Sequence, residues 1–164
     1  MVHLPLNVAI SAVVKNNMIQ LIQRDKGDYK GLLGLAGGKV EKDEHLLNSA
    51  KRENVEETGV ECNFEKYLGV VSEHLIENKK IKEHFILHVF LLTPAKSNKT
   101  GTPELKTCWV ELNRIEEIKD RIIPSDYLII KKMIKKNNIT KNNKKYFECV
   151  LEKINENYVL KKFE

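Results

Sequence analysis

The chain has 164 residues, which suits one domain with a sizeable core and is too short for two ordinary domains. Its hydrophobic content of 41% is ordinary, no run approaches the roughly 20 apolar residues of a membrane span, and no secretory signal is visible, so we expect a cytoplasmic protein without a membrane partner. The net charge is +5, and the excess is in the tail: residues 131–164 hold ten Lys and four acids (net +6), which leaves 18 basic and 19 acidic residues (net −1) in 1–130.

The chain begins with a predicted β-hairpin. Two apolar, β-branched runs, 7–14 and 18–23, are separated by the turn-forming residues 15–17. Arg24 follows the second strand, where it either faces a substrate phosphate in a cleft or lies in solvent. A polar loop at 25–31 and a short strand at 32–35 come next.

The glycines that follow raise the question of a phosphate-binding P-loop. That motif is excluded because Leu33 stands at the position of its first glycine and Val40 replaces the required Ser or Thr. Gly37 and Gly38 instead allow the backbone to approach a ligand closely. Lys39 either neutralises a substrate phosphate or is solvated.

The next predicted element is a helix at 45–57 that carries three glutamates on one narrow arc. Glu53, Glu56 and Glu57 stand at i, i+3 and i+4. Like charges at this spacing destabilise a helix, so helix stability does not explain them, whereas a bound cation does. Oxygen ligands without nearby histidines or thiolates favour Mg²⁺ over zinc, with Mn²⁺ as the alternative.

This stretch resembles the Nudix box of the Nudix (MutT-type) hydrolases. Two positions depart from the family pattern: Asn54 stands in the predicted buried arc where the family usually has an apolar residue, and Ala36 replaces a proline. Neither position supplies a ligand. The residues that carry the resemblance are Gly38, Glu44, Arg52-Glu53, Glu56-Glu57 and Gly59-Val60.

The resemblance implies a fold and a reaction. The fold is α/β (α+β), a Nudix-type α/β/α sandwich with a mixed sheet between helices, which we expect over residues 1–136, followed by a basic extension at 137–164. The reaction is Mg²⁺-dependent hydrolysis of a nucleoside diphosphate linked to another group X, by attack of water at phosphorus.

The resemblance also implies roles for single residues. Glu56 and Glu57 are the principal metal ligands, and the Gly37 carbonyl adds a ligand. Glu53 is either a ligand or the base for the attacking water. Arg52 orients the glutamates by charge-assisted hydrogen bonds. Glu44 is an auxiliary acid.

Two further strands are predicted at 62–71 and 84–92, with the turn between them near 79–82. Glu73 and His74, on the way to that turn, either line the cleft or face solvent, and we favour solvent.

Histidines and cysteines give no second metal site. His84 and His88 share one face of a strand but lack a third ligand in register, so we do not assign them to a metal. Three cysteines without CxxC spacing argue against a disulfide framework and a zinc site, namely Cys62, Cys108 and Cys149.

A polar loop at 94–103 lies near the substrate in this interpretation. A strand at 107–111, a short helix at 113–119 and a capped amphipathic helix at 126–136 complete the predicted domain. Similar sequences in the family carry an acid a few residues before such a tryptophan-containing strand. Glu104 occupies that place, as an alternative base or an extra ligand.

The basic extension is predicted to form a loop at 137–145 and a terminal hairpin from 146–154 and 158–163. Such a hairpin lies outside the family's core pattern. We favour a solvated, Lys-rich appendage. A nucleic-acid contact and a homodimer contact remain open alternatives.

The substrate is expected to be a small nucleotide, and the box does not identify it. We favour a (deoxy)nucleoside triphosphate by elimination, because Leu75 and Ile76 replace the proline of ADP-ribose-specific relatives, and Glu77 and Asn78 replace the tyrosine of dinucleoside polyphosphate hydrolases. The alternatives are an ADP-ribose or other nucleotide-sugar pyrophosphatase, an RNA 5′-end pyrophosphohydrolase and a non-catalytic nucleotide sensor.

Overall fold

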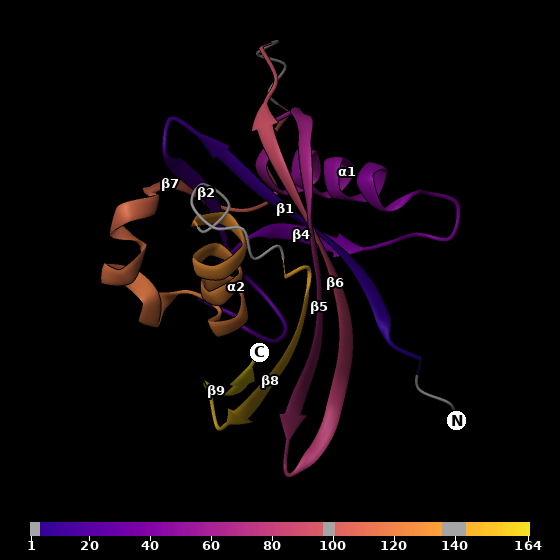
Figure 1. The fold of residues 1–164 in the computed structure, drawn as a ribbon, viewed down its shortest axis with the longest axis vertical. Helices are drawn as coiled ribbons and strands as arrows, with labels where there is room; N and C mark the ends of the chain where they lie inside the picture. Colours follow the sequence, from indigo (N-terminus) through magenta and orange to yellow (C-terminus); the bar gives the residue numbers. More distant parts are fainter. Residues whose placement is uncertain (1–3, 97–100, 136–143) are drawn as a thin grey trace.

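The computed structural model describes residues 4–96, 101–135 and 144–164 (Figure 1). Parts of two predicted loops, at 94–103 and 137–145, therefore lie outside the described residues. The predicted domain boundary between 136 and 137 and the last residue of the predicted helix at 126–136 lie outside them as well.

A mixed β-sheet forms the centre of the fold. Its strands follow one another in the order β3-β2-β1-β6-β5-β8-β9, while β4 pairs with β1 and β7 with β2. The β1–β6 and β5–β8 pairs are parallel, and the other strand pairs are antiparallel. The strands are β1 (Leu6–Lys15), β2 (Met18–Gln23), β3 (Leu33–Gly34), β4 (Ala36–Lys39), β5 (Cys62–Glu77), β6 (Lys80–Pro94), β7 (Thr107–Glu111), β8 (Tyr146–Ile154) and β9 (Asn157–Phe163).

Helices pack against the sheet from both sides (Figure 1). Helix α1 (Leu46–Thr58) covers one side, where Ala50 contacts a small core with Val13 and Leu92. The larger core lies on the other side, beneath the 3₁₀ helix η1 (Leu112–Arg121), helix α2 (Pro124–Ile129) and the π-helical turn η2 (Ile130–Ile134). The predicted Nudix-type mixed sheet between helices is confirmed. Among the described residues, no helix is long and apolar enough to cross a membrane.

The predicted strands are present, although the one predicted at 32–35 is the two-residue β3, followed by the unpredicted β4. Two others are much longer than expected. Strands β5 and β6 extend to a two-residue turn at Asn78 and Lys79, which adopt positive φ angles of 53° and 60°. This geometry is favoured in tight hairpins because its twist matches that of the strands. The turn therefore lies at the start of the predicted position near 79–82, and Glu73 and His74 lie inside a strand.

The helical elements after β7 differ in type from the predicted ones. The predicted helix at 113–119 is a 3₁₀ helix, and the predicted helix at 126–136 begins earlier, because Pro124 occupies its first turn, where the missing N–H of proline costs no hydrogen bond. It widens to a π-helical turn after Ile129.

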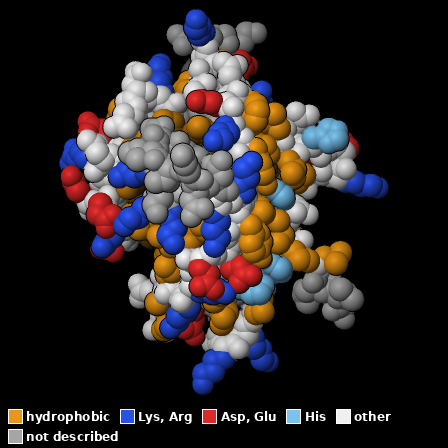
Figure 2. Space-filling view, in the orientation of Figure 1, with side chains coloured by type: hydrophobic (Ala, Val, Ile, Leu, Met, Phe, Trp, Pro, Cys, Tyr) orange, Lys and Arg blue, Asp and Glu red, His pale blue; other side chains and the backbone are white. Residues whose placement is uncertain are grey.

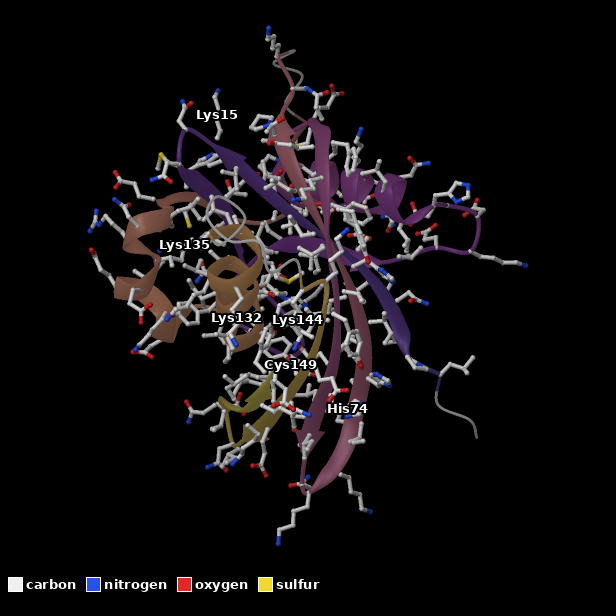
Figure 3. The ribbon with its side chains drawn as sticks, viewed as in Figure 1. Lys15, His74, Lys132, Lys135, Lys144 and Cys149 are labelled. Carbon is white, nitrogen blue, oxygen red and sulfur yellow. The ribbon has the colours of Figure 1, made fainter. Side chains whose placement is uncertain are left out.

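The C-terminal hairpin is joined to the main sheet. Strand β8 pairs in parallel with β5, and the side chains of Phe147, Cys149 and Leu151 belong to the larger core. Figure 3 shows the labelled Cys149 among the side chains between β8 and the helices. The division into residues 1–136 and 137–164 stays a prediction. Deletion of 137–164 would remove core residues, so the role of this segment is better tested by substitution.

Candidate active site

Arg52 holds two carboxylates of α1, those of Glu53 and Glu56, and the carboxylate of Glu44 just before the helix. The Arg52 guanidinium donates to both oxygens of Glu44, with Nε–Oε2 and Nη2–Oε1 distances of 3.0 and 2.7 Å. Its Nη1 donates to Glu53 Oε1 at 2.8 Å and to Glu56 Oε2 at 3.0 Å. These bonds from Arg52 lower the pKa of Glu44 to about 2. One cation thus brings together three acids that would otherwise repel one another.

Glu57 turns away from Arg52 and lies against β4. Its Oε2 accepts a hydrogen bond from the Gly37 N–H at 2.9 Å. The pKa of Glu57 is raised to about 7, mainly by burial and with contributions from the charges of Glu53 and Glu104, against the opposing effects of the Gly37 N–H and of Arg24. Burial of the Glu57 carboxyl group therefore outweighs the compensation that the Gly37 N–H and the charge of Arg24 provide.

The absence of side chains at Gly37 and Gly38 allows close contacts around the carboxylates. A Cβ on Gly38 would lie 2.3 Å from the Glu53 carboxyl carbon, and a Cβ on Gly37 would lie 2.4 Å from the Ala9 carbonyl oxygen. Glu53 thus occupies the space that a side chain at 38 would fill. Gly37 lets β4 approach β1. Burial also raises the pKa of Glu53, even though Arg52 opposes this shift.

Asn54, which departs from the Nudix pattern, is accommodated at the end of the same helix. Its side chain is fully buried, and Nδ2 donates to the Val60 carbonyl oxygen at 2.7 Å and to Cys62 Sγ at 3.3 Å. The amide therefore ties the end of α1 to the strand that follows. Ala36, the other departure, is buried in β4.

The donor set fits a hard divalent cation in its chemistry. The carboxylates of Glu53, Glu56 and Glu57 offer only oxygen ligands, and a cation would compensate the charge that burial disfavours at Glu53 and Glu57. In the part of the chain that the structure describes, however, no three His, Cys, Asp or Glu side chains already converge on one point as metal ligands do. Instead, Glu53 and Glu56 contact Arg52 and Glu57 contacts Gly37.

A pocket of about 210 Å³ opens beside the glycines. Its walls are mostly apolar, and Gly37, Gly38 and Lys39 are among the residues that line it. The polar side chains in its lining are those of Arg24, Tyr29, Glu73, Ser125 and Asp126. A larger groove of about 570 Å³ lies between β7 and η1, but neither the α1 carboxylates nor the glycines line it. The smaller pocket is lined by Gly37 and Gly38, which contact Glu57 and Glu53. We therefore regard the smaller pocket as the one that belongs to the site.

Arg24 lines this pocket, and its predicted contact with a substrate phosphate stays a prediction. Its charge acts on both Glu57 and Asp126, and its Nε has no hydrogen-bond partner among the described residues. Lys39 lies at the pocket with an exposed side chain. Glu104 is exposed too, but its N–H donates to the Glu56 carbonyl oxygen at 3.1 Å, which places it near the end of α1.

The favoured solvent-facing position of Glu73 is wrong. Only 2% of this residue is exposed, because β5 continues past residue 71, β8 pairs with it there, and Tyr29 and Ser125 contact the Glu73 side chain. Glu73 Oε1 accepts a hydrogen bond from the Tyr29 hydroxyl at 3.0 Å. Burial raises the pKa of Glu73, although Ser125, Tyr29 and Cys149 lie close enough to lower it in part. Its Oε2 has no partner of ordinary hydrogen-bond geometry among the described residues.

Asp126 is a site residue that the sequence reasoning missed, since it was read only as part of a capped helix. Its Oδ2 accepts the Leu35 N–H at 2.8 Å, and burial raises its pKa to about 7. An acid directly after Pro124-Ser125 at a helix start was the available signal, but the same pattern also marks an ordinary helix cap.

Stability should decrease as the pH rises through the range in which Asp126 ionises. Because its pKa is higher in the folded protein than in the unfolded chain, the folded state binds the proton more tightly, and stability falls between about pH 4 and pH 7. We expect wild type to lose about 2 kcal/mol more stability than Asp126→Asn between pH 5.5 and 7.5. Urea unfolding of both proteins at the two pH values measures this difference. Equal losses would contradict the assignment.

Comparison with known proteins points in one direction. A family model described as NUDIX domain matches residues 5–132. An "ADP-ribose pyrophosphatase" of Methanocaldococcus jannaschii is 31% identical over 113 residues, which cover 68% of this chain and 65% of that protein. An "8-oxo-dGTP diphosphatase" of Buchnera aphidicola is 38% identical over 66 residues, which cover 38% of this chain and 50% of that protein.

The matched stretches thus span about two-thirds and one half of these two curated relatives. Among solved structures, a mutator MutT protein from Bacillus halodurans has a similar fold, with a TM-score of 0.70 and 22% identity, over 97% of this chain and 96% of that one.

Proposed function

Because this chain belongs to the NUDIX family, we propose that it is a pyrophosphohydrolase that cleaves a nucleoside diphosphate linked to another group X into a nucleoside monophosphate and P–X. One observation carries the proposal. The carboxylates of Glu53, Glu56 and Glu57 lie along the last turns of α1, next to Gly37 and Gly38, which line a mostly apolar pocket with a few polar side chains. Acids beside a pocket suit chemistry on a phosphate anhydride better than they suit a structural role.

A divalent cation is part of this proposal. We assign its binding to Glu53, Glu56 and Glu57, with the Gly37 carbonyl as a further ligand, and we favour Mg²⁺ over Mn²⁺. When bound, such an ion neutralises negative charge on phosphate oxygens and makes water more acidic. Arg52 then keeps its role of orienting the glutamates, and Glu44 supports Arg52 from the other side.

A side chain of the protein must accept the proton that the attacking water loses. The oxygen of water forms a bond to phosphorus, the P–O bond to the leaving group breaks, and a carboxylate accepts the proton of water. Glu53 serves as this base in place of its role as a ligand, and burial, which raises its pKa, makes it a stronger base than an ordinary glutamate. Glu104, near the same helix end, is the alternative.

The nucleoside end of the substrate is assigned to the pocket. Its volume of about 210 Å³ is below the roughly 300–1,000 Å³ of pockets that enclose drug-sized ligands, so it suits a base better than a whole nucleotide. Apolar walls suit a base plane, and Glu73 and Asp126 offer polar groups to a base edge. Arg24 and Lys39 are assigned to the phosphates.

A (deoxy)nucleoside triphosphate is our first choice for the substrate, and an ADP-ribose or nucleotide-sugar substrate is the second. The names of the two curated relatives divide between these choices. We expect kcat/KM for at least one deoxynucleoside triphosphate to exceed that for ADP-ribose by tenfold or more. Initial rates with Mg²⁺ across the four triphosphates, ADP-ribose and a nucleotide sugar measure this ratio. A higher value for ADP-ribose would transfer the assignment to the second choice.

Action on RNA 5′ ends is a weaker alternative. Lysines gather on the face shown in Figure 2, and Figure 3 labels Lys132, Lys135 and Lys144 there. Two of them already contact the protein, since Lys132 Nζ donates to the Phe163 carbonyl at 3.2 Å and Lys144 Nζ lies 5.3 Å from the centre of the Phe147 ring. Loss of 5′-triphosphorylated RNA binding in the double variant Lys132→Ala and Lys144→Ala would favour this alternative.

A further inference from the structure

The pocket wall contains a tyrosine whose backbone is in an unfavourable conformation. Tyr29 lies in the loop between β2 and β3, only 8% of it is exposed, and its φ angle is 65°. A bulky residue seldom adopts positive φ, so contacts elsewhere must hold it there. Burial raises the pKa of the Tyr29 hydroxyl, which therefore stays protonated and donates to Glu73 Oε1 at 3.0 Å.

The contacts that hold Tyr29 come from the C-terminal hairpin. The Tyr29 N–H donates to the Tyr158 hydroxyl oxygen of β9 at 2.8 Å, and the two ring centres are 4.3 Å apart. The Tyr158 hydroxyl donates in turn to Asp28 Oδ1 at 3.3 Å. Two lysines also bind Asp28 Oδ1: Lys82 at 3.0 Å and Lys153 of β8 at 3.5 Å. Residues about 130 positions apart are thus joined at the wall of the pocket.

The hairpin has a fixed position relative to the opposite part of that wall. Strand β8 pairs in parallel with β5, with Cys149 opposite Glu73. Within the hairpin, Tyr158 stands opposite Lys153. The strand that carries Glu73 and the hairpin that carries Tyr158 therefore form one rigid frame, and Tyr29 connects its two parts.

We propose that the C-terminal hairpin determines base selectivity: Tyr158 is a positioning residue that, through Tyr29, sets the shape of the pocket wall around Glu73. This inference rests on the proposed function, because it assigns a task to the same pocket. Tyr158 itself does not line the pocket, whereas Tyr29 and Glu73 do. The hairpin then contributes to the substrate site by positioning Tyr29.

The test removes one hydroxyl group and keeps both rings. In Tyr158→Phe, the Tyr29 N–H loses its acceptor and Asp28 loses a donor, while the ring contact remains. We expect KM for the best triphosphate to rise about tenfold, because the variant loses the acceptor of the Tyr29 N–H and a hydrogen bond to the Asp28 carboxylate, with kcat within about twofold of wild type. We also expect the ratio of kcat/KM values among the four bases to become more even.

Tyr146→Phe is the matched control. Tyr146 lies on the same hairpin, is 50% exposed, and donates to Glu148 at 3.3 Å on the surface. It should leave KM and base preference unchanged. A double-mutant cycle adds Tyr29→Phe, and a role of Tyr158 through Tyr29 predicts that the two effects on KM are not additive.

The outcomes separate this inference from the proposed function. Absence of turnover by wild type on every nucleotide would refute the proposed function, and with it this inference. If wild type is active and Tyr158→Phe has wild-type KM and base preference, the inference is overturned and the proposed function stands. Strictly additive effects in the cycle would also overturn it.

Discussion

Glu57→Gln is expected to lower turnover at least 100-fold while the protein remains folded. The amide oxygen can still accept the Gly37 N–H, which now lies 2.9 Å from Glu57 Oε2, and the side-chain volume is unchanged. Only the negative charge is lost, so the variant removes the interaction with a cation and with the developing charge at phosphorus. A loss of 100-fold corresponds to about 2.7 kcal/mol of transition-state stabilisation.

Stability should respond in the opposite way, because burial disfavours the charged form of Glu57. The variant should be as stable as wild type or slightly more stable above pH 7, where the buried carboxyl group carries its charge. Glu65→Gln, a neutralised glutamate on an exposed part of β5, is the control and should retain wild-type turnover. Near wild-type turnover in Glu57→Gln would refute the site assignment.

The second large effect is expected when each of the two neighbouring glycines is replaced by alanine. One replacement should lower turnover and the other should lower stability. In Gly38→Ala the new methyl group meets only the carboxyl end of Glu53, a flexible group that can move. We expect a small change in melting temperature and a loss of turnover of tenfold or more, because Glu53 is displaced from its place beside Arg52.

In Gly37→Ala the methyl group instead meets the backbone carbonyl of Ala9 in β1 at 2.4 Å, where the sheet cannot yield. We expect a loss of stability of about 2 kcal/mol or more. Thermal unfolding and steady-state kinetics on both variants give the comparison. Equal destabilisation by the two alanines would show that Glu53 does not lie against Gly38.

The sequence was sufficient to predict the parts of the site that are close together in the chain. Three glutamates at i, i+3 and i+4 share a helix face wherever that helix packs, so α1 and its acidic arc followed from spacing alone. The contact between Arg52 and Glu56 is likewise one turn long. Gly37 and Gly38 were recognised as places of close approach, but the groups that approach them, Ala9 and the Glu53 carboxyl, became known only from the fold.

The missed parts depend on contacts between distant segments. Glu73 is buried because β5 runs on to Glu77 and is then covered by β8, and neither event is visible in the residues around position 73. Asp126 gains its place in the pocket from the Leu35 N–H, 91 positions earlier in the chain. The contact of Tyr29 with Tyr158 is of the same kind. Hydrophobic periodicity carries no information about such pairs.

The most direct test of the account is product analysis with and without a divalent cation. Wild type is incubated with its best nucleotide in Mg²⁺ or in EDTA, Glu57→Gln is incubated in Mg²⁺, and the products are separated by ion-exchange chromatography. The account predicts a nucleoside monophosphate and P–X from wild type in Mg²⁺, and at most 1% of that rate in the other two reactions. Equal product formation in EDTA, or by Glu57→Gln in Mg²⁺, would contradict it.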